Sequence, residues 1–388
     1  MRKKILLCHD TGTGKTLTSI LWANKVAENN VLVIVPKALR ENWRRNLHQY
    51  STKDWIVYTK EEFRTMWATV RDYDAIIVDE AHYFAGMKSQ MHKNLMKYLK
   101  KYRTENVLLA TATPYLSTPW NIYAIAALLG HEWSYSRFQA KFFTQQHFHK
   151  RIVWTPKAGC KDEIATLVAK LGDIVHIEEC ADIPDQTFET ELFSLNSAQE
   201  KAKEEVEEFN PVVLFTKHHQ IENGTLKGEK GYTDDLFIQS DKADRVVELA
   251  QTNKKVAIVC RYNLQINLYV SLLEKKVKKN IYVIQGKTKN RDAVVQQVEQ
   301  EKECVVLINA ACSEGYELPS VGLCVFASLS FSYKDYKQML GRFLRINKLK
   351  KNVYLHLVTK GGIDESVYKS IMNKQDFDIA IYAEKNRP

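Results

Sequence analysis

A short glycine-rich stretch, residues 12–16, ends in Lys15 and Thr16 and separates an apolar run from a helix-like pattern. Glycines let backbone N–H groups turn towards phosphates, and the start of a helix adds positive potential there. Lys15 would reach the β- and γ-phosphates of a nucleotide, and the Thr16 hydroxyl would hold Mg²⁺. The stretch therefore predicts a phosphate loop. The residues predicted to bind the nucleotide are Thr11, Gly12, Thr13, Gly14, Lys15 and Thr16.

Two carboxylates, Asp79 and Glu80, follow one another at the end of a later apolar run. Asp79 would coordinate Mg²⁺ together with Thr16, and Glu80 would orient and deprotonate the attacking water. A pair like this, taken alone, is more often the start of a solvated loop. Its place after a phosphate loop, at a second strand end of one sheet, favours the catalytic interpretation. His82 would link the pair to moving parts of the molecule.

Two threonines, Thr111 and Thr113, end the next apolar run, where they could simply cap a turn. Beside the phosphate loop and the acidic pair, we interpret them as a hydrogen-bonding relay between the nucleotide and a second substrate.

Gln338, Arg342 and Arg345 are spaced by four and three residues in a helix-like pattern, so they share one face. A polar stripe on a helix surface has the same spacing. The face could instead present two guanidiniums to a γ-phosphate held by another domain, and such an arginine raises the rate of hydrolysis by about 10³–10⁵. We interpret the three residues as catalytic.

Short apolar runs alternate with helix-like patterns in both halves of the chain, which predicts an α/β fold with parallel sheets. The predicted strands are 5–8, 31–35, 56–58, 75–78 and 106–110, then 256–260, 281–284, 304–308, 321–327 and 353–358. The predicted helices are 16–28, 38–50, 61–70 and 89–101, then 264–275, 291–300 and 334–344. The middle, about 119–207, is rich in aromatic residues and mostly helical in pattern. We expect its aromatic side chains to pack against the first half rather than to stack on bases.

The chain has 388 residues, a net charge of +10 and a pI near 9.0. This charge favours a polyanionic partner, because each neutralised phosphate releases counterions. Its seven cysteines form no CxxC pair, so neither a zinc site nor a disulfide framework is indicated. Neither a membrane-spanning run nor a signal peptide is apparent, and we expect a cytoplasmic protein of a bacterium or a phage-infected host.

These motifs, in this order, carry a family resemblance. The stretch 10–16 is similar to helicase motif I, the Asp-Glu-Ala-His of 79–82 to motif II, and 338–345 to motif VI. The stretch 33–43 is similar to motif Ia, and its ending in Asn42 and Trp43 resembles the Swi/Snf-type form of that motif. The chain thus resembles the superfamily-two helicases and, more closely, the Swi/Snf-type DNA translocases.

The resemblance implies two RecA-like domains in tandem with a helical insertion between them. The first would span 1–185, with an aromatic helical protrusion at about 116–170, and the second 186–388. It implies ATP as the nucleotide, with Gly315 and Glu317 of motif V as further ATP-binding residues. The residues that it implies for nucleic-acid binding are Lys37, Thr59, Arg261, Gly286, Lys287 and Thr288.

The function that we predict is an ATP-dependent motor that translocates on or remodels duplex, branched or single-stranded DNA, largely without reading its sequence. The chain could be a naturally compact motor, such as a phage encodes, or a fragment. A DEAH-type RNA helicase is the alternative, and a non-catalytic nucleotide-gated module is a weaker one. The chain departs from the family at His9, where Gly or Ala is usual, and Met1 leaves no room for the upstream glutamine element that reads adenine. The choice of adenine and the choice between unwinding and translocation are left open.

Overall fold

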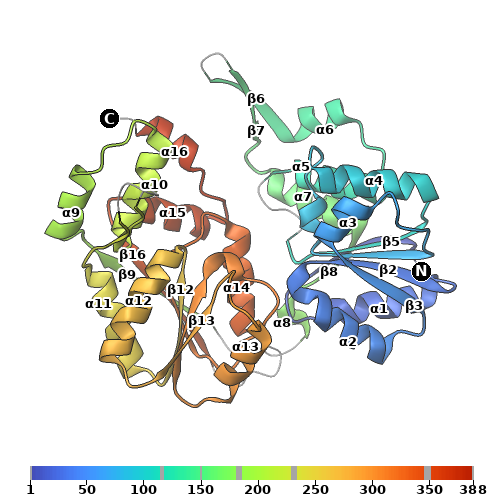
Figure 1. Ribbon diagram of the computed structural model, residues 1–388. Coiled ribbons are helices and arrows are strands. Elements are labelled where there is room, and N and C mark those ends of the chain that lie inside the picture. Colours follow the sequence, from blue (N-terminus) through green and yellow to red (C-terminus); the bar gives the residue numbers. More distant parts are fainter. Residues whose placement is uncertain are drawn as a thin grey trace. The chain divides into compact units, whose positions relative to one another are not determined.

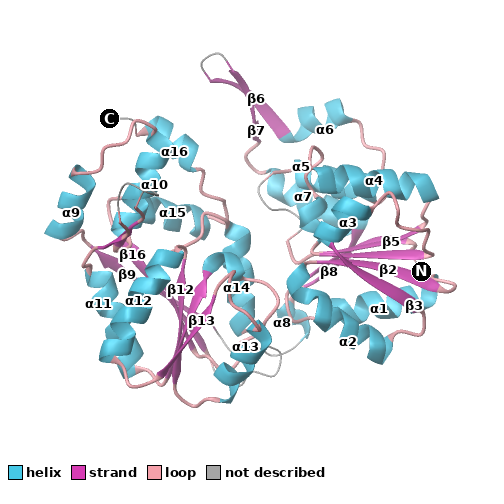
Figure 2. Cartoon of the chain, viewed as in Figure 1, coloured by secondary structure: helices cyan, strands magenta, loops and turns pink. Residues whose placement is uncertain are grey.

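The computed structural model describes residues 2–113, 118–148, 151–180, 186–228, 234–344 and 351–386. Contacts between residues divide the chain into two compact units, Met1–Asp182 (unit 1) and Ile183–Pro388 (unit 2). The division lies close to the predicted boundary. Each unit is a six-stranded, all-parallel sheet with helices on both faces (Figures 1 and 2). The predicted α/β fold class with two parallel sheets is therefore confirmed.

The sheet of unit 1 has the strand order β3-β2-β4-β5-β1-β8. Its strands are β1 (Lys4–His9), β2 (Asn30–Val35), β3 (Asp54–Thr59), β4 (Ala75–Asp79), β5 (Asn106–Ala110) and β8 (Gly172–Val175). Its helices are α1 (Lys15–Val26), α2 (Arg40–Tyr50), α3 (Lys60–Met66), α4 (Gln90–Tyr102), α5 (Trp120–Leu128), α6 (Tyr135–Phe142), α7 (Cys160–Leu171) and α8 (Ile177–Cys180). Short 3₁₀ turns lie at η1 (Lys37–Leu39) and η2 (Ala81–Phe84).

Successive residues of the central strands serve the two faces of this sheet in turn, as the period of two requires. Leu7 and Val33 lie in the core cluster that α1 and α2 cover, which also holds Trp43. Leu6 and Leu32 lie in the other cluster, which α3, α4, α5 and α7 cover. Burial on both faces explains why these strands are apolar throughout.

The aromatic middle corrects one prediction. Its helices α5, α6 and α7 exist, but β6 (Phe143–Phe148) and β7 (Arg151–Pro156) form an antiparallel hairpin between them, which projects from unit 1 (Figure 1). The prediction of a helical pattern is therefore wrong for β6 and β7, whereas α5, α6 and α7 are helices, as predicted. The aromatic side chains pack against the core of unit 1, as predicted, with Phe138, Phe142 and Phe143 in its core cluster. They also pack on one another: the Trp120 ring stacks on Tyr135 and Phe143 at centroid distances of 4.5 and 4.8 Å.

The sheet of unit 2 has the strand order β13-β14-β12-β15-β16-β9. Its strands are β9 (Gln186–Phe193), β12 (Lys255–Cys260), β13 (Asn280–Ile284), β14 (Cys304–Asn309), β15 (Leu323–Phe326) and β16 (Asn352–Thr359); β10 (Thr225–Leu226) and β11 (Leu236–Phe237) pair separately. Its helices are α9 (Ser197–Glu204), α10 (Pro211–Glu222), α11 (Asp241–Thr252), α12 (Asn263–Lys276), α13 (Arg291–Gln300), α14 (Tyr333–Phe343), α15 (Ile363–Met372) and α16 (Ile379–Lys385), with a 3₁₀ turn η3 (Ala310–Cys312). Within the described ranges, no helix has the length and hydrophobicity needed to cross a bilayer.

His356 makes the stability of unit 2 depend on pH. It is buried on β16, its Nδ1 lies 3.1 Å from the Glu189 carbonyl, and its Nε2 lies 3.0 Å from the Tyr336 hydroxyl. Burial lowers the pKa of His356 from 6.5 to about 4. The folded protein therefore disfavours the proton, so the stabilisation is complete above pH 6.5 and is lost as the pH falls towards 4.

Over that window, His356 should remove about 3 kcal/mol from the free energy of unfolding of unit 2. We expect His356→Asn to make the free energy of unfolding less dependent on pH, because the asparagine amide can still donate to the Glu189 carbonyl but does not titrate. Urea unfolding at several pH values, followed by far-UV circular dichroism, measures it. If the free energy of unfolding changed equally with pH in the two proteins, His356 would be excluded as the origin of the pH dependence.

Candidate nucleotide site and nucleic-acid interface

The phosphate loop joins β1 to α1 and has the backbone that its glycines predict. Gly12 and Gly14 have φ of 90° and 87°, a left-handed conformation that glycine adopts without strain, and Gly14 caps the N-terminus of α1. The Lys15 ammonium donates to the carbonyls of His9 and Asp10 at 2.7 and 3.0 Å. It therefore lies over the loop, where a nucleotide phosphate would replace these carbonyls as its partner.

Asp79 ends β4 and is buried, with an exposed fraction of 6%. The Trp43 indole Nε1 donates to Asp79 Oδ2 at 2.7 Å, and the Glu80 backbone N–H donates to Oδ1 at 2.9 Å. Burial, together with the negative charge of Glu80, raises the pKa of Asp79 to about 6, against the opposing effects of Trp43 and Lys15. The phosphate loop follows β1 and the acidic pair ends β4, so both lie at the carboxyl edge of one parallel sheet.

Glu80 adopts a left-handed backbone, with φ of 49°, which is uncommon for a residue with a side chain and is often found at functional sites. Its Oε2 lies 3.1 Å from His82 Nδ1, which is also 3.1 Å from the Thr111 hydroxyl. The Thr113 backbone N–H donates to that same hydroxyl at 3.1 Å. Of the residues predicted to couple the site to its surroundings, His82 thus lies beside Glu80, Thr111 beside His82 and Thr113 beside Thr111, and their role stays a prediction.

The donor set fits Mg²⁺. This ion takes oxygen ligands and usually binds through one or two protein groups together with substrate phosphates. Thr16 offers a hydroxyl at the start of α1, and Asp79 offers a carboxylate that has about four acceptor positions, of which hydrogen bonds occupy two. In the described part of the chain, no group of three or more His, Cys, Asp or Glu residues could hold a metal without a nucleotide.

In unit 2, Gln338 and Arg342 lie buried on α14, and Arg345 lies outside the described residues. The Arg342 guanidinium donates to the Tyr316 carbonyl at 2.9 Å and to the Gln338 carbonyl at 3.2 Å. The Ser313 hydroxyl donates to Gln338 Oε1 at 3.1 Å. Residues of α14 therefore hold the loop 313–317, a contact that the sequence did not predict.

That loop carries the two other predicted ATP-binding residues. Gly315 has a φ of 86°, which requires glycine, and the Glu317 side chain is exposed. Both positions follow β14 through η3, at the carboxyl end of the sheet of unit 2. Their contact with a nucleotide stays a prediction.

The predicted nucleic-acid contacts of unit 1 lie at the carboxyl edge of its sheet, as the phosphate loop does. Lys37 is exposed and begins the 3₁₀ turn that follows β2. Thr59 ends β3, but it is buried, and its hydroxyl accepts a hydrogen bond from the Glu62 backbone as the N-cap of α3. Of these two side chains, only that of Lys37 is open to a phosphate.

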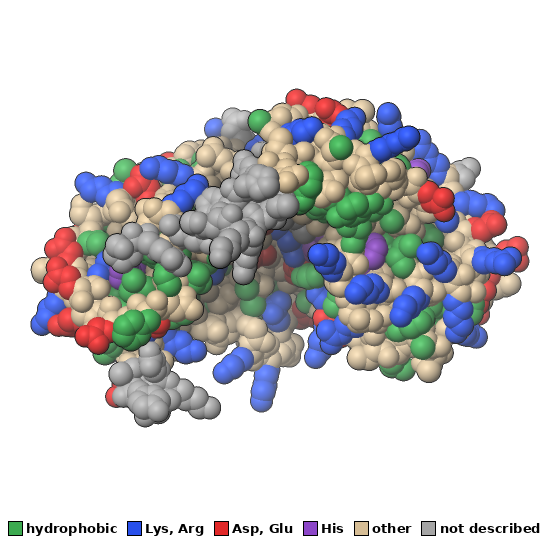
Figure 3. Space-filling model, turned by 90° about the horizontal axis from the view of Figure 1, so that it is seen from above, with side chains coloured by type: hydrophobic (Ala, Val, Ile, Leu, Met, Phe, Trp, Pro, Cys, Tyr) green, Lys and Arg blue, Asp and Glu red, His purple; other side chains and the backbone are tan. Residues whose placement is uncertain are grey.

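The predicted contacts of unit 2 follow β12 and β13 at the corresponding edge of its sheet. Gly286 and Lys287 are exposed, whereas the Thr288 hydroxyl bonds the Val283 carbonyl within its turn. The Arg261 guanidinium lies over the Phe331 ring, 3.5 Å from its centroid. Lys and Arg side chains are spread over both units rather than gathered in a single patch on the face seen in Figure 3.

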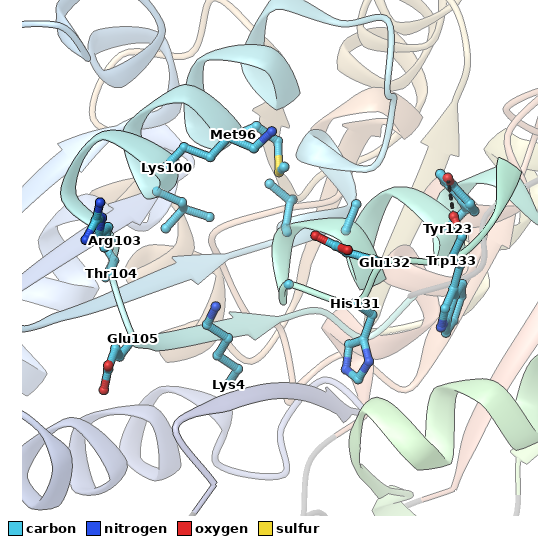
Figure 4. Close-up of a pocket in the computed structure, with 14 residues that line it drawn as sticks. Lys4, Met96, Lys100, Arg103, Thr104, Glu105, Tyr123, His131, Glu132 and Trp133 are labelled. Carbon is cyan, nitrogen blue, oxygen red and sulfur yellow. Dashed lines mark hydrogen bonds between the residues drawn. The ribbon is translucent and has the colours of Figure 1, made fainter.

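A separate pocket of about 540 Å³ lies at the amino-terminal ends of β1 and β5, the edge opposite the phosphate loop. Figure 4 shows Lys4 and Glu132 pointing into it and Glu105 pointing away. None of the predicted site residues lines this pocket. The predicted chemistry therefore belongs to the carboxyl edge alone.

Comparisons with known proteins agree with this geometry. Residues 241–347 match the family described as "Helicase conserved C-terminal domain", and residues 1–65 match "Type III restriction enzyme, res subunit". The chain is 23% identical to the Xenopus laevis "SWI/SNF-related matrix-associated actin-dependent regulator of chromatin subfamily A-like protein 1", over 96% of this chain and 41% of that protein. The resemblance to superfamily-two helicases of the Swi/Snf type is therefore confirmed.

A Bacillus subtilis protein named "Uncharacterized ATP-dependent helicase YqhH" is 21% identical over 96% of this chain and 75% of its own length. The fold resembles that of the Pyrococcus furiosus Hef helicase domain, with a TM-score of 0.54 and 15% identity over 95% of both chains. This neighbour is a helicase domain, and the predicted tandem of two RecA-like domains is confirmed. The chain spans about two fifths of the length of the Xenopus relative.

Proposed function

We propose that the chain is a nucleic-acid-stimulated ATPase that uses ATP and Mg²⁺ to translocate on or remodel DNA, without reading its sequence. The observation that carries the proposal is the arrangement around Asp79. Asp79 ends β4, which is separated only by β5 from β1 and its phosphate loop, and its carboxylate accepts the backbone N–H of Glu80. The phosphate loop, the proposed metal ligand Asp79 and the proposed base Glu80 therefore all belong to the carboxyl edge of the sheet of unit 1.

Each residue has a defined part in this proposal. Lys15 leaves the carbonyls of His9 and Asp10 and binds the β- and γ-phosphates. Thr16 and Asp79 hold Mg²⁺, which neutralises charge on the phosphates when it is bound. Glu80 orients the attacking water and accepts its proton, and His82 lies between the Glu80 carboxylate and the Thr111 hydroxyl.

Gln338, Arg342 and Arg345 would stabilise the charge that develops on the γ-phosphate. They belong to unit 2, so hydrolysis in this proposal requires both units. The guanidinium of the buried Arg342 donates a hydrogen bond to the loop that carries Gly315 and Glu317. This hydrogen bond connects the two residues that we propose to bind ATP to α14.

Lys37, Arg261, Gly286 and Lys287 would contact DNA phosphates, with Thr59 and Thr288 shaping the two turns. Contacts of this type position a nucleic acid without specifying its sequence, and their affinity falls steeply as salt rises. The Swi/Snf resemblance favours DNA over RNA as the substrate, because the relatives that carry this name include a regulator of chromatin.

The test compares ATPase rates with single-stranded, duplex and forked DNA and with RNA at two salt concentrations. We expect DNA to raise the rate at least ~10-fold, which corresponds to only about 1.4 kcal/mol of the barrier, and higher salt to reduce the effect. Equal rates with and without nucleic acid would refute the coupling, and stimulation by RNA alone would favour the DEAH-type RNA helicase.

In the same ATPase assay, Lys37→Ala tests a single proposed contact with DNA. The variant should need a higher DNA concentration for half-maximal stimulation, because one phosphate contact is lost. Lys100→Ala is the matched control, since Lys100 is also exposed but lines the pocket at the opposite edge of the sheet. Equal effects of the two substitutions would show a general loss of charge rather than a contact at Lys37.

A further inference from the structure

Trp43 makes an unusual contact for a core tryptophan. It lies on α2 with an exposed fraction of 1%, in the core cluster between the sheet of unit 1 and the helices α1 and α2. A buried indole N–H must find an acceptor, and it can only donate. The acceptor here is Asp79 Oδ2, at 2.7 Å, which is a carboxylate of the proposed metal site.

The contact completes the fixation of the Asp79 carboxylate. One oxygen accepts the backbone N–H of Glu80, the next residue in the chain, and the other accepts Trp43 from a different element. Two donors on two oxygens fix both the position and the plane of a carboxylate. Hydrogen bonds to an ionised carboxylate are also roughly twice as strong as those between neutral groups.

We propose that Trp43 is a positioning residue of the ATPase site, whose indole N–H holds Asp79 in the orientation that binds Mg²⁺ or a water of its shell. This inference rests on the proposed function, in which Asp79 is a metal ligand. Groups that orient a metal ligand in this way change metal affinity or activity by about 10–100-fold when they are removed. A purely structural tryptophan would change stability and leave the dependence on metal alone.

The chain provides a matched control in Trp22. This residue is buried with an exposed fraction of 4% in the same core cluster, and its Nε1 donates to the Arg2 carbonyl at 3.0 Å. Trp22→Phe and Trp43→Phe therefore remove the same ring area and one indole hydrogen bond each. Only the second substitution removes a donor to Asp79.

The experiment titrates Mg²⁺ against the binding of a fluorescent, non-hydrolysable ATP analogue. For Trp43→Phe we expect the half-saturating Mg²⁺ concentration to rise about 10–100-fold, with affinity in EDTA within about twofold of wild type. Trp22→Phe should follow the wild-type curve. Identical curves for both variants would overturn the inference, whereas a wild type without Mg²⁺-dependent binding would refute the proposed function itself.

A double-mutant cycle separates positioning from packing. If Trp43 acts through Asp79, Trp43→Phe should change the Mg²⁺ dependence no further in an Asp79→Ala background, in which no side-chain oxygen is left to accept the indole N–H. Additive effects would overturn the inference.

A measurement on the wild type covers the case in which Trp43→Phe does not fold. The chain has seven tryptophans, so ¹⁵N-indole labelling gives a small set of signals. Asp79→Asn and the addition of Mg²⁺ with the analogue should shift the same indole N–H signal. The absence of any signal that responds to both would contradict the inference.

Discussion

Replacing Glu80 by glutamine should leave nucleotide binding intact and lower the rate of ATP hydrolysis by about 10²–10⁴-fold, the usual contribution of a general base. Glutamine keeps the volume of the side chain and an oxygen that can still face His82, 3.1 Å from Glu80 Oε2. It cannot accept the proton of the attacking water. The left-handed backbone of Glu80, with φ of 49°, stays the same in the variant and preserves the site.

Two measurements make this prediction specific. Binding of the fluorescent ATP analogue with Mg²⁺ should give a dissociation constant close to that of the wild type, and phosphate release with saturating DNA should give the loss of rate. Glu105→Gln is the control, because Glu105 is an exposed carboxylate paired with Lys3 at 2.5 Å, on the opposite edge of the same sheet. Turnover of Glu80→Gln at the wild-type rate would remove Glu80 from the role of base.

The phosphate loop and the acidic pair could be predicted because their geometry is local. Two glycines between a strand and a helix allow the left-handed backbone that a phosphate loop needs, and Asp79 and Glu80 come at the end of an otherwise apolar strand. Parallel strands meet with their carboxyl ends at one edge, which brings Lys15 and Asp79 together. The order of such elements along a sequence therefore already specifies most of this half of the site.

The missed strands are those with little local signal. Strand β8 has four residues, one of them Asp173, and β9 is mostly polar and largely exposed at the edge of its sheet. β9 pairs along its whole length with β16, more than 150 residues later in the chain. Pairings at such separation depend on the fold of the whole unit, which no short window of sequence contains.

The missed contacts of the site have the same cause. Trp43 is recognisable as part of a motif, but its partner Asp79 lies 36 residues away on another element. The hydrogen bond from Arg342 to the Tyr316 carbonyl spans 26 residues and involves a backbone atom, which is the same in every residue type. The types and spacing of the residues predict which side chains belong to the candidate site. Their hydrogen-bond partners on other elements depend on how those elements pack, which the spacing does not reveal.

A third long-range contact gives the largest expected effect on stability. Asp364 lies at the start of α15 with an exposed fraction of 3%, and the Lys242 ammonium on α11 donates to its Oδ2 at 2.8 Å. His219 Nε2 lies 3.2 Å from Oδ1, and the Thr359 backbone N–H donates to Oδ2 at 2.8 Å. Burial opposes ionisation, but the charges and hydrogen bonds of Lys242 and His219 outweigh it and hold the pKa of Asp364 well below its usual range.

Asp364→Asn should therefore lower the free energy of unfolding of unit 2 by about 3–5 kcal/mol, because it leaves the buried Lys242 ammonium without its counter-charge. Asparagine also brings an N–H₂ group to a place where Lys242 and the Thr359 backbone N–H both donate. A lowered pKa gives stability that is present above the unfolded pKa, near 3.9, and lost as the pH falls towards the folded value. The difference in free energy of unfolding between the variant and the wild type should accordingly be the same from pH 6 to pH 8.

The distribution of tryptophans allows the two units to be followed separately in this experiment. All seven tryptophans belong to unit 1, so their fluorescence reports the unfolding of unit 1 while far-UV circular dichroism reports both units. Asp364→Asn should lower the midpoint of the unfolding transition of unit 2, which circular dichroism detects, and leave the fluorescence transition of unit 1 unchanged. Asp244→Asn breaks an exposed pair with Lys276, 3.8 Å apart, and should cost at most about 1 kcal/mol. Equal destabilisation by the two substitutions would mean that the buried network adds no more than a surface ion pair.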